Sequence, residues 1–401
     1  MLSTIIYRSH LCDDVPVRSL AALARNANQI NTSMGVTGIL LFNGTHFFQL
    51  LEGPGEAVST VYRNICRDPR HHNLVELMYD VTPSRRFGNA GMELFNLREH
   101  DRDGVLQAVL DKGTTQYQLT YDDRALKLLR TFVEAVETEN YFEIPSADGW
   151  EFITQAQDNA LSPDLSASGV GFAFQPVVDP LAQKIISYEA LLRCADGRSP
   201  EQYFDSMNHA ERLRADLDSK LQAFTFAAKL LSPGVTLSIN LFPAVLTELP
   251  GSVEYLLNAI LSAGLVPEQV TVEITENAGV TPPAEFDVAV RQLRAAGIRL
   301  AIDGFGTGNS GLMMLTRFQP DIIKIDRNII SNVHKSGPKQ AVILAIIRCC
   351  ASLEISVVAE GVEEPQEWMW LESAGVSSFQ GFLFAIPGST GVPAVAWPEL
   401  K

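Results

Sequence analysis

The chain has 401 residues, of which 46% are hydrophobic and 19% are charged. This length and composition exclude a disordered protein and allow two domains, or a barrel with an attached domain. The formal net charge of -16 argues against a general nucleic-acid surface, so an anionic ligand would need metal ions or a local group of cations.

Cysteine usage and hydropathy indicate the compartment. The five cysteines are scattered and form no CxxC pair, which predicts neither a disulfide framework nor a cysteine metal site. No apolar run approaches the ~18 residues of a transmembrane helix, and residues 1–8 lack a signal-peptide pattern. We therefore expect a cytoplasmic protein that does not bind membranes.

The first hundred residues predict the order strand, helix, strand, strand, helix, strand, which is ferredoxin-like. Asn43-Gly44 between two apolar runs is a strong signal for a tight hairpin turn. In chain order, the predicted elements are a strand at 2–8, a helix at 16–31, strands at 36–42 and 45–51, a helix at 56–68 and a strand at 73–81.

Polar residues within these apolar elements are candidates for function. Tyr7 ends the first strand, Asn31 ends the first helix, and Gln49 lies between Phe48 and Leu50 in a strand that we expect to be buried. A buried amide needs hydrogen-bond partners. The residues alone leave open whether Gln49 belongs to a structural polar network or to a binding site.

Separated motifs in this region resemble those of BLUF domains, the blue-light sensors that hold FAD. They are Tyr7, 31–38 (NTSMGVTG), 47–53 (FFQLLEG), 85–87 (RRF) and Met92. The resemblance covers about residues 1–97 and implies FAD as the cofactor, with Tyr7 and Gln49 as the photoactive pair, Asn31 at the flavin ring edge and Met92 near Gln49. An amide can exchange its donor and acceptor faces, so Gln49 could rewire hydrogen bonds without moving charge. Many family members carry Trp two residues before the Met, where this chain has Ala90.

Residues 98–164 are expected to form connecting helices. Amphipathic patterns predict helices at 103–112 and 122–140, and 162–169 looks like a flexible lead-in to the next domain. These helices could cover the open face of the first domain's sheet, relay a signal between domains, or do both, and the sequence does not separate these possibilities.

Residues 165–401 alternate strand-like and helical stretches, the pattern of an α/β (TIM-like) barrel. The predicted strands are 172–178, 184–193, 235–241, 269–275, 298–303, 321–325, 355–359 and 376–379, with helices such as 210–231, 253–263, 283–296, 339–352 and 366–373 between them. Eight strands can close a barrel with a filled interior.

Polar residues stand in or directly after seven of these strands. They are Glu189, Asn240, Glu273, Asp303, Lys324, Glu360 and Gln380. In a βα barrel such positions converge at the C-terminal face, where active sites lie. Carboxylate and amide oxygens suit Mg²⁺ or Mn²⁺, and such ions with one lysine suit phosphoryl transfer to water. His209 and His334 are expected at the surface.

The motifs around these residues resemble EAL-domain phosphodiesterases, which hydrolyse cyclic di-GMP to linear pGpG with two divalent cations. The matching segments are 174–177 (FQPV), 189–193 (EALLR), 238–240 (SIN), 273–276 (EITE), 303–308 (DGFGTG), 321–326 (DIIKID), 359–363 (AEGVE) and 380–383 (QGFL). The resemblance covers about residues 165–390.

The resemblance also implies roles for individual residues. Metal ligands are Glu189, Asn240, Glu273 and Asp303. Lys324 and Glu360 would orient or activate water, with Glu189 completing the catalytic set. Gln175, Leu192 and Arg193 would contact substrate, Gln380 would support the site, and Glu276 would anchor the loop after Asp303 as a regulatory element at a dimer surface.

The chain departs from the EAL pattern at Gly304, where the family usually has a second Asp that helps to bind the second metal. We therefore expect weaker binding at that position. The sequence predicts a homodimeric, blue-light-regulated cyclic di-GMP phosphodiesterase. The alternatives are a cyclic di-GMP receptor that does not hydrolyse its ligand, and a light-controlled interaction protein.

Overall fold

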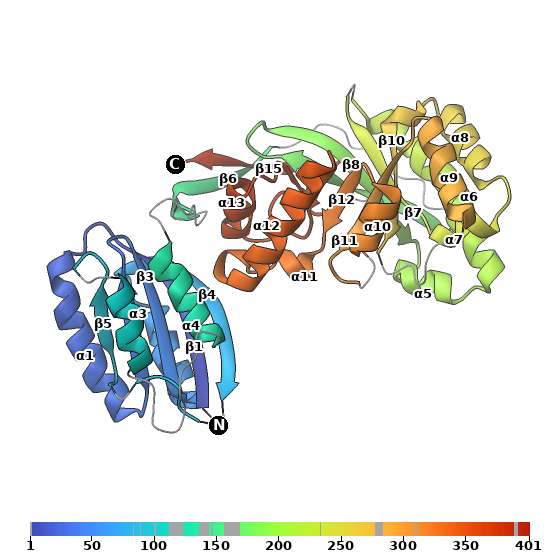
Figure 1. Cartoon of the computed structure of the whole chain (residues 1–401). Helices are drawn as coiled ribbons and strands as arrows, with labels where there is room; N and C mark the ends of the chain where they lie inside the picture. The colour runs from blue at the N-terminus through green and yellow to red at the C-terminus, as the bar shows by residue number, and fades with distance from the viewer. Residues whose placement is uncertain are drawn as a thin grey trace. The chain divides into compact units, whose positions relative to one another are not determined.

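The computed structural model describes residues 2–82, 84–88, 90–99, 102–111, 123–135, 144–145, 147–155, 169–232, 234–276, 284–308, 311–388 and 392–401. The chain forms two compact units (Figure 1). Unit 1 comprises Met1–Glu143 with Asn332–Val342, and unit 2 comprises Ile144–Ser331 with Ile343–Lys401. None of the helices in the described residues combines the length and the hydropathy needed to cross a membrane.

Unit 1 is built on a five-stranded sheet of order β4-β1-β3-β2-β5. Its elements are β1 (Leu2–Leu11), the short helix η1 (Val17–Ser19), α1 (Leu20–Ser33), β2 (Thr37–Phe42), β3 (His46–Pro54), α2 (Gly55–Ile65), β4 (His71–Thr82) and β5 (Glu93–Asn96). The ferredoxin-like order is confirmed. The fifth strand, which pairs in parallel with β2, was not predicted because four residues carry too little pattern.

The two faces of this sheet have different covers. Ile5 and Tyr7 pack with residues of α1 and α2, whereas the intervening Ile6 packs with residues of α3 (Arg102–Asp111) and α4 (Arg124–Glu134). This alternation follows from the two-residue period of a strand. The predicted connecting helices therefore do cover a face of the sheet, as Figure 1 shows. The helix predicted at 122–140 starts later than expected, because Asp123 is the N-cap of α4. The end of that predicted helix, 136–140, and most of the predicted flexible lead-in, 162–168, lie outside the described residues.

Unit 2 contains a closed eight-stranded barrel of order β10-β11-β12-β13-β14-β7-β8-β9. All eight predicted strands are present: β7 (Val170–Asp179), β8 (Lys184–Cys194), β9 (Thr236–Asn240), β10 (Val270–Thr275), β11 (Arg299–Phe305), β12 (Ile322–Ile325), β13 (Ser356–Ala359) and β14 (Ser378–Phe379). The TIM-like barrel is confirmed, with one strand that departs from the parallel arrangement. Strand β7 runs antiparallel to both neighbours, because a turn at 180–183 joins it to β8 where a parallel pair would need a crossover helix.

Helices separate the later strands of the barrel (Figure 1). They are α5 (Pro200–Asp205), α6 (His209–Leu230), α7 (Pro243–Glu248), α8 (Ser252–Ser262), η3 (Pro267–Gln269), α9 (Ala284–Ala295), α10 (Gly311–Phe318), α11 (Arg327–Ile330), η4 (Val333–Lys335), α12 (Gly337–Ser352) and α13 (Pro365–Ser373). The strand register places Asn240 of β9 directly beside Glu273 of β10, and Thr275 beside Asp303 of β11. The C-terminal strand ends therefore meet at one face of the barrel, as expected.

A small second sheet belongs to unit 2. Strand β6 (Trp150–Gln155), which follows the short helix η2 (Ala147–Gly149), pairs antiparallel with β15 (Val395–Leu400). Trp150 and Phe152 pack edge-on against Trp368 of α13, with ring centroids 5.1 and 5.7 Å away. Residues 150–155, which lie within the predicted connecting region, therefore form a strand that packs on the barrel.

Candidate functional site

Lys324 lies at the centre of the polar cluster in the barrel. Its Nζ atom is 2.9 Å from Glu189 Oε2, 2.7 Å from Glu273 Oε2 and 2.5 Å from Glu360 Oε1. Asp303 also interacts electrostatically with Lys324. Three carboxyl groups therefore contact a single ammonium group and a fourth acts on it electrostatically, so acidic groups outnumber the one cation of the cluster.

Amide side chains complete this cluster. Asn240 Nδ2 donates to Glu189 Oε1 at 2.7 Å, and Gln380 Nε2 donates to Glu189 Oε2 at 2.8 Å. Gln380 also lies 3.2 Å from Gln175, whose amide in turn donates to the Ala385 carbonyl. The structure thus brings together all seven residues predicted from the strand ends.

Burial in this cluster changes the proton affinities of its members. Burial raises the pKa of Glu273 to about 8 and the pKa of Glu360 well above its ordinary value, although Lys324 opposes both shifts. Burial also disfavours ionised Glu189, but Lys324 and the amide hydrogen bonds outweigh it, so the pKa of Glu189 is lowered. Burial disfavours the charged form of Lys324, but the surrounding carboxylates hold its pKa well above the ordinary value.

A cavity of about 340 Å³ opens at this cluster. Of the predicted site residues, those that line it are Gln175, Glu189, Asp303, Glu360 and Gln380. Asn240, Glu273 and Lys324 join the cluster through hydrogen bonds without lining the cavity. Leu192 and Arg193 do not line it either, and the Arg193 guanidinium donates to the Leu192 carbonyl at 3.0 Å. Their contact with substrate stays a prediction.

The cavity also has lining residues to which the sequence motifs assigned no role, namely Asp326, Arg327, Gly361, Glu363, Gly381 and Phe382. Arg327 forms an ion pair with Glu363. Asp326 is the N-cap of α11 and accepts from the Asn328 amide at 2.7 Å. Their position in the sequence could have identified them. They closely follow Lys324, Glu360 and Gln380, the polar residues already predicted at the ends of three strands.

Glu276 holds the loop that follows Asp303. Its buried carboxylate accepts hydrogen bonds from the amides of Gly306 at 2.6 Å and Gly311 at 2.7 Å, and its own amide donates to the Asp303 carbonyl at 3.0 Å. This is the anchoring geometry that the sequence predicts for Glu276. A regulatory effect of this anchor remains a prediction.

The oxygen-rich cluster fits divalent cations. The carboxylates around Lys324 outnumber its single positive charge, and burial raises the pKa values of Glu273 and Glu360. The buried Oε1 atom of Gln380 has no hydrogen-bond partner among the described residues. Within those residues no set of three His, Cys, Asp or Glu side chains is already arranged around a common metal position, because Lys324 occupies the centre of the carboxylates.

Unit 1 contains a separate cavity of about 260 Å³ between the sheet and α1 and α2. All four residues predicted to bind the cofactor, Tyr7, Asn31, Gln49 and Met92, line it. The Tyr7 hydroxyl donates to Gln49 Oε1, and Gln49 Nε2 lies 3.6 Å from Met92 Sδ. Asn31 donates to the Gly91 carbonyl at 2.8 Å, which ties α1 to the segment that carries Met92. The apolar walls and the polar Tyr7–Gln49 pair suit a flavin ring.

The polar residues of this cavity that sequence reasoning missed include Asp68, Arg70 and His71. Arg70 Nε donates to Asp68 Oδ1 at 2.8 Å, and this contact lowers the pKa of Asp68. Burial lowers the pKa of His71, whose Nδ1 lies 2.8 Å from Ser9 Oγ. These residues occupy the turn before β4 and the start of that strand, where a short charged run resembles an ordinary surface loop.

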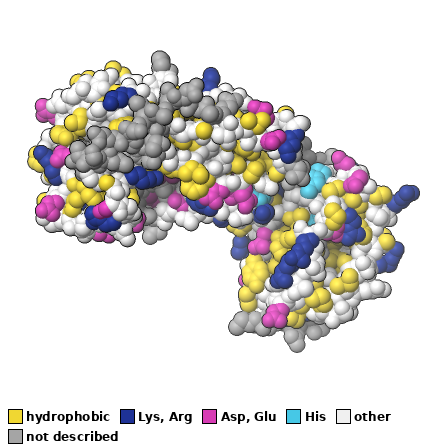
Figure 2. All heavy atoms as spheres, turned by 180° about the vertical axis from the view of Figure 1, so that it is seen from behind, with side chains coloured by type: hydrophobic (Ala, Val, Ile, Leu, Met, Phe, Trp, Pro, Cys, Tyr) yellow, Lys and Arg dark blue, Asp and Glu magenta, His cyan; other side chains and the backbone are white. Residues whose placement is uncertain are grey.

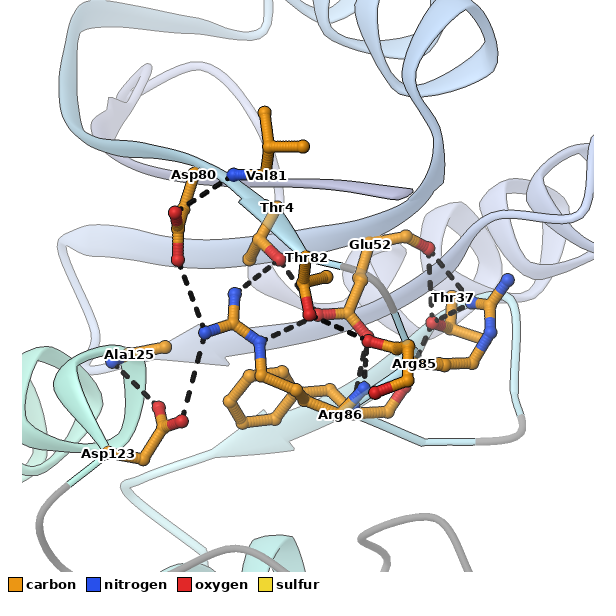
Figure 3. A network of polar contacts seen from close by, with 12 residues as sticks. Thr4, Thr37, Glu52, Asp80, Val81, Thr82, Arg85, Arg86, Asp123 and Ala125 are labelled. Atoms are coloured by element: carbon orange, nitrogen blue, oxygen red, sulfur yellow. Dashed lines mark hydrogen bonds and ion pairs between the residues drawn. The ribbon is translucent and has the colours of Figure 1, made fainter. Parts of the chain in front are cut away.

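A buried ion network lies in unit 1 near the start of α4 (Figure 3). The Glu52 carboxylate, fully buried on β3, accepts from Thr4 Oγ1 at 2.7 Å and from the backbone amides of Arg86 and Phe87 at 2.5 and 3.1 Å. The Arg86 guanidinium lies 3.3 Å from Glu52 and 3.7 Å from Asp123, the N-cap of α4. The network therefore joins the strand of Gln49 to helix α4.

Arg86→Met is expected to destabilise unit 1 by about 3–5 kcal/mol, because it leaves the buried Glu52 carboxylate without its cationic partner. The midpoint of urea denaturation, followed by circular dichroism, measures the change. Arg63→Met on exposed α2 surface is the control, with an expected effect within about 0.5 kcal/mol. Equal midpoints for the two variants would contradict the stabilising role of the Arg86–Glu52 pair.

On the face seen in Figure 2, the Lys and Arg side chains of the described residues lie among acidic and apolar ones. His209 is exposed and contacts Glu248, as expected. The expectation that His334 lies at the surface is wrong. Its side chain is buried, at 8% exposure, because η4 packs against β4 within unit 1.

Comparisons with known proteins agree with both parts of this geometry. Residues 158–387 match the family model "EAL domain", and residues 2–93 match "Sensors of blue-light using FAD". The chain is 54% identical to "Blue light- and temperature-regulated antirepressor BluF" of Escherichia coli (strain K12), over the whole of both chains. A structure of Klebsiella pneumoniae BlrP1 in a manganese/cy-diGMP complex is similar over the whole of both chains, with 41% identity and a TM-score of 0.92. A standalone EAL protein from Vibrio cholerae O395, bound to c-di-GMP, matches 56% of this chain and 95% of its own, with 33% identity and a TM-score of 0.53.

Proposed function

Because this chain belongs to the EAL family and carries an N-terminal BLUF domain, we propose that it is a blue-light-regulated phosphodiesterase that hydrolyses cyclic di-GMP to linear pGpG. The observation that carries the proposal is the cluster in which Lys324 contacts Glu189, Glu273 and Glu360 beside the 340 Å³ cavity. Carboxylates are costly to bury and repel an anionic nucleotide, so a site that only binds cyclic di-GMP, without cations, has no need of so many of them.

The chain's own residues have distinct tasks in this reaction. Glu189, Asn240, Glu273 and Asp303 would hold two divalent cations, Mg²⁺ or Mn²⁺. When bound, these ions supply positive charge to the substrate phosphate and lower the pKa of water. Glu360 lines the cavity and contacts Lys324, which places it to orient a water molecule and accept its proton. Attack of that water on phosphorus breaks one of the two phosphodiester linkages.

The flavin of unit 1 is proposed to be FAD, held in the cavity with Tyr7, Asn31, Gln49 and Met92. Absorption of blue light would change the hydrogen bonds of Gln49, whose oxygen accepts from Tyr7 and whose nitrogen faces Met92. A homodimer in the cytoplasm is part of the same proposal.

Turnover of cyclic di-GMP, measured as pGpG formation in the dark and under blue light while Mg²⁺ or Mn²⁺ is titrated, tests this function. We expect metal-dependent hydrolysis that stops when EDTA removes the cations, and a different rate in the light. No pGpG at any metal concentration would refute the enzyme proposal, and equal rates in dark and light would refute the regulation.

Gly304→Asp is expected to lower the Mn²⁺ concentration that gives half-maximal turnover, by about tenfold. A Cβ atom at Gly304 would have only Thr307 Oγ1 within 4 Å, at 3.7 Å, so a Cβ atom fits there without a clash. The backbone φ of +69° is strained for most residues, but Asp and Asn tolerate it better than others do. Gly304→Asn is the matched control, with the same shape and strain but no charge. Identical metal dependence for the two variants would contradict a role for the added carboxylate.

A second candidate function is that of a light-responsive antirepressor. The 54% identity to BluF over the full length of both chains favours it, and so does the absence of a carboxylate at Gly304. In that case the barrel would bind a protein repressor, with or without cyclic di-GMP, and would not hydrolyse the nucleotide. Repressor binding that changes with light and survives Glu189→Ala would favour this function over the enzyme.

A further inference from the structure

An ion pair buried in helix α6 of unit 2 has no part in the chemistry described above. Lys220 Nζ lies 2.5 Å from Asp216 Oδ1, and the two side chains are only 4% and 5% exposed. Such a pair is costly to bury, and replacement by apolar residues of similar volume is often neutral or stabilising. Stability alone is therefore a weak reason for its presence.

The second oxygen of Asp216 reaches the end of strand β9. Asp216 Oδ2 accepts from the Phe242 backbone amide at 2.8 Å, and Phe242 is the residue that precedes α7. The ring of Phe242 packs against the ring of Phe204, with the two centroids 5.0 Å apart. The guanidinium carbon of Arg212 lies over the Phe242 ring, 4.4 Å from its centroid. Helix α6 thus holds the turn that follows Asn240.

The backbone at Asn240 and at the two residues after it is held by neighbouring elements. It pairs in register with Glu273, and the next amide, that of Leu241, donates to the Glu273 carbonyl at 2.9 Å. The following amide, that of Phe242, is the one held by Asp216. Asn240 Nδ2 donates to Glu189, which makes Oδ1 its candidate atom for a cation.

Lys220 has a separate task in this arrangement. Its ammonium group neutralises the Asp216 carboxylate. Asp216 can therefore accept the hydrogen bond from the Phe242 amide without adding an unpaired negative charge near the carboxylate cluster. Lys220 also lies 3.3 Å from Ser219 Oγ, which donates to the Asp216 carbonyl and fixes the pair on the helix.

We propose that the Asp216–Lys220 pair is a positioning element for divalent-cation binding, which holds Asn240 in place through the Phe242 amide. This inference rests on the proposed metal-dependent function of the barrel. Groups that orient metal ligands typically change metal affinity by about 10–100-fold when they are removed.

Two double variants separate the hydrogen bond from the charge. Asp216→Leu with Lys220→Met removes both charges and the acceptor for Phe242. Asp216→Asn with Lys220→Met also removes both charges but keeps an oxygen acceptor. Neither variant leaves an unpaired buried charge, so both are expected to fold, which circular dichroism checks.

Mn²⁺ binding to the full chain, measured as the free Mn²⁺ signal in electron paramagnetic resonance without substrate, is the readout. The Leu/Met variant is expected to bind Mn²⁺ about 10–100-fold more weakly, and the Asn/Met variant to bind close to wild type. Asp218→Ala is the control, because Asp218 pairs with Arg214 at the same i,i+4 spacing on the exposed side of α6. Its Mn²⁺ affinity should be unchanged.

The outcomes distinguish this inference from the proposed function. Wild-type affinity in the Leu/Met variant would overturn the positioning role alone. Equal losses in the Leu/Met and Asn/Met variants would overturn it too, because the charge and not the hydrogen bond would then matter. A wild-type chain that binds no Mn²⁺ would overturn the metal site itself.

Discussion

Glu189→Ala is expected to abolish hydrolysis of cyclic di-GMP, with a loss of about 100-fold or more. Glu189 is the most connected carboxylate of the cluster, since it contacts Lys324, Asn240 and Gln380. Its removal takes away a proposed metal ligand and frees the two amides that it orients. Lys324 would still pair with Glu273 and Glu360, so the remaining buried charges stay partly compensated.

The rate of pGpG formation at saturating Mn²⁺ measures this effect. Glu254→Ala, an exposed glutamate on α8, is the control and should keep wild-type turnover. Circular dichroism establishes that both variants fold. Turnover that persists in the Glu189 variant would show that the metal-ligand set is assigned to the wrong residues.

Gln49→Ala is expected to remove the light response entirely. In the wild type, blue light should shift the flavin absorption band reversibly to longer wavelength, because the hydrogen bonds around the ring change. Gln49 provides the link between Tyr7 and Met92, as it accepts from the first and faces the second. Alanine has no group that can exchange donor and acceptor roles.

Absorption spectra recorded before and after blue light measure the shift. Gln29→Ala, on the exposed side of α1, should keep the wild-type shift. Both variants must be yellow, which shows that flavin is bound. A shift that survives in the Gln49 variant would mean that another residue is the photoactive partner of Tyr7.

The two effects also test whether the units communicate. A Gln49 variant with normal turnover in the dark but no change in the light would place Gln49 on the sensing side only. The Arg86 network offers a physical route within unit 1, since Glu52 lies three residues beyond Gln49 on β3 and Arg86 connects it with the N-cap of α4 (Figure 3).

Most elements of this fold were predictable from local pattern. Tyr7, Asn31, Gln49 and Met92 could be singled out as polar or motif residues, and the polar residues at the barrel strand ends followed from apolar runs that stop at a carboxylate, an amide or Lys324. Strands β5, β6 and β15 and the antiparallel direction of β7 were missed. Strand β5 is too short to show a period, and the direction of β7 depends on a turn where most barrels have a helix.

The sequence by itself singled out the residues that we propose to carry the chemistry, since apolar runs and short motifs are local properties of the chain. Only the tertiary structure decided how they meet. Lys324 contacts Glu189 across 135 residues of chain, and Asp216 reaches Phe242 from a helix on the outside of the barrel. Contacts of this kind depend on barrel closure and strand register, which no local pattern encodes.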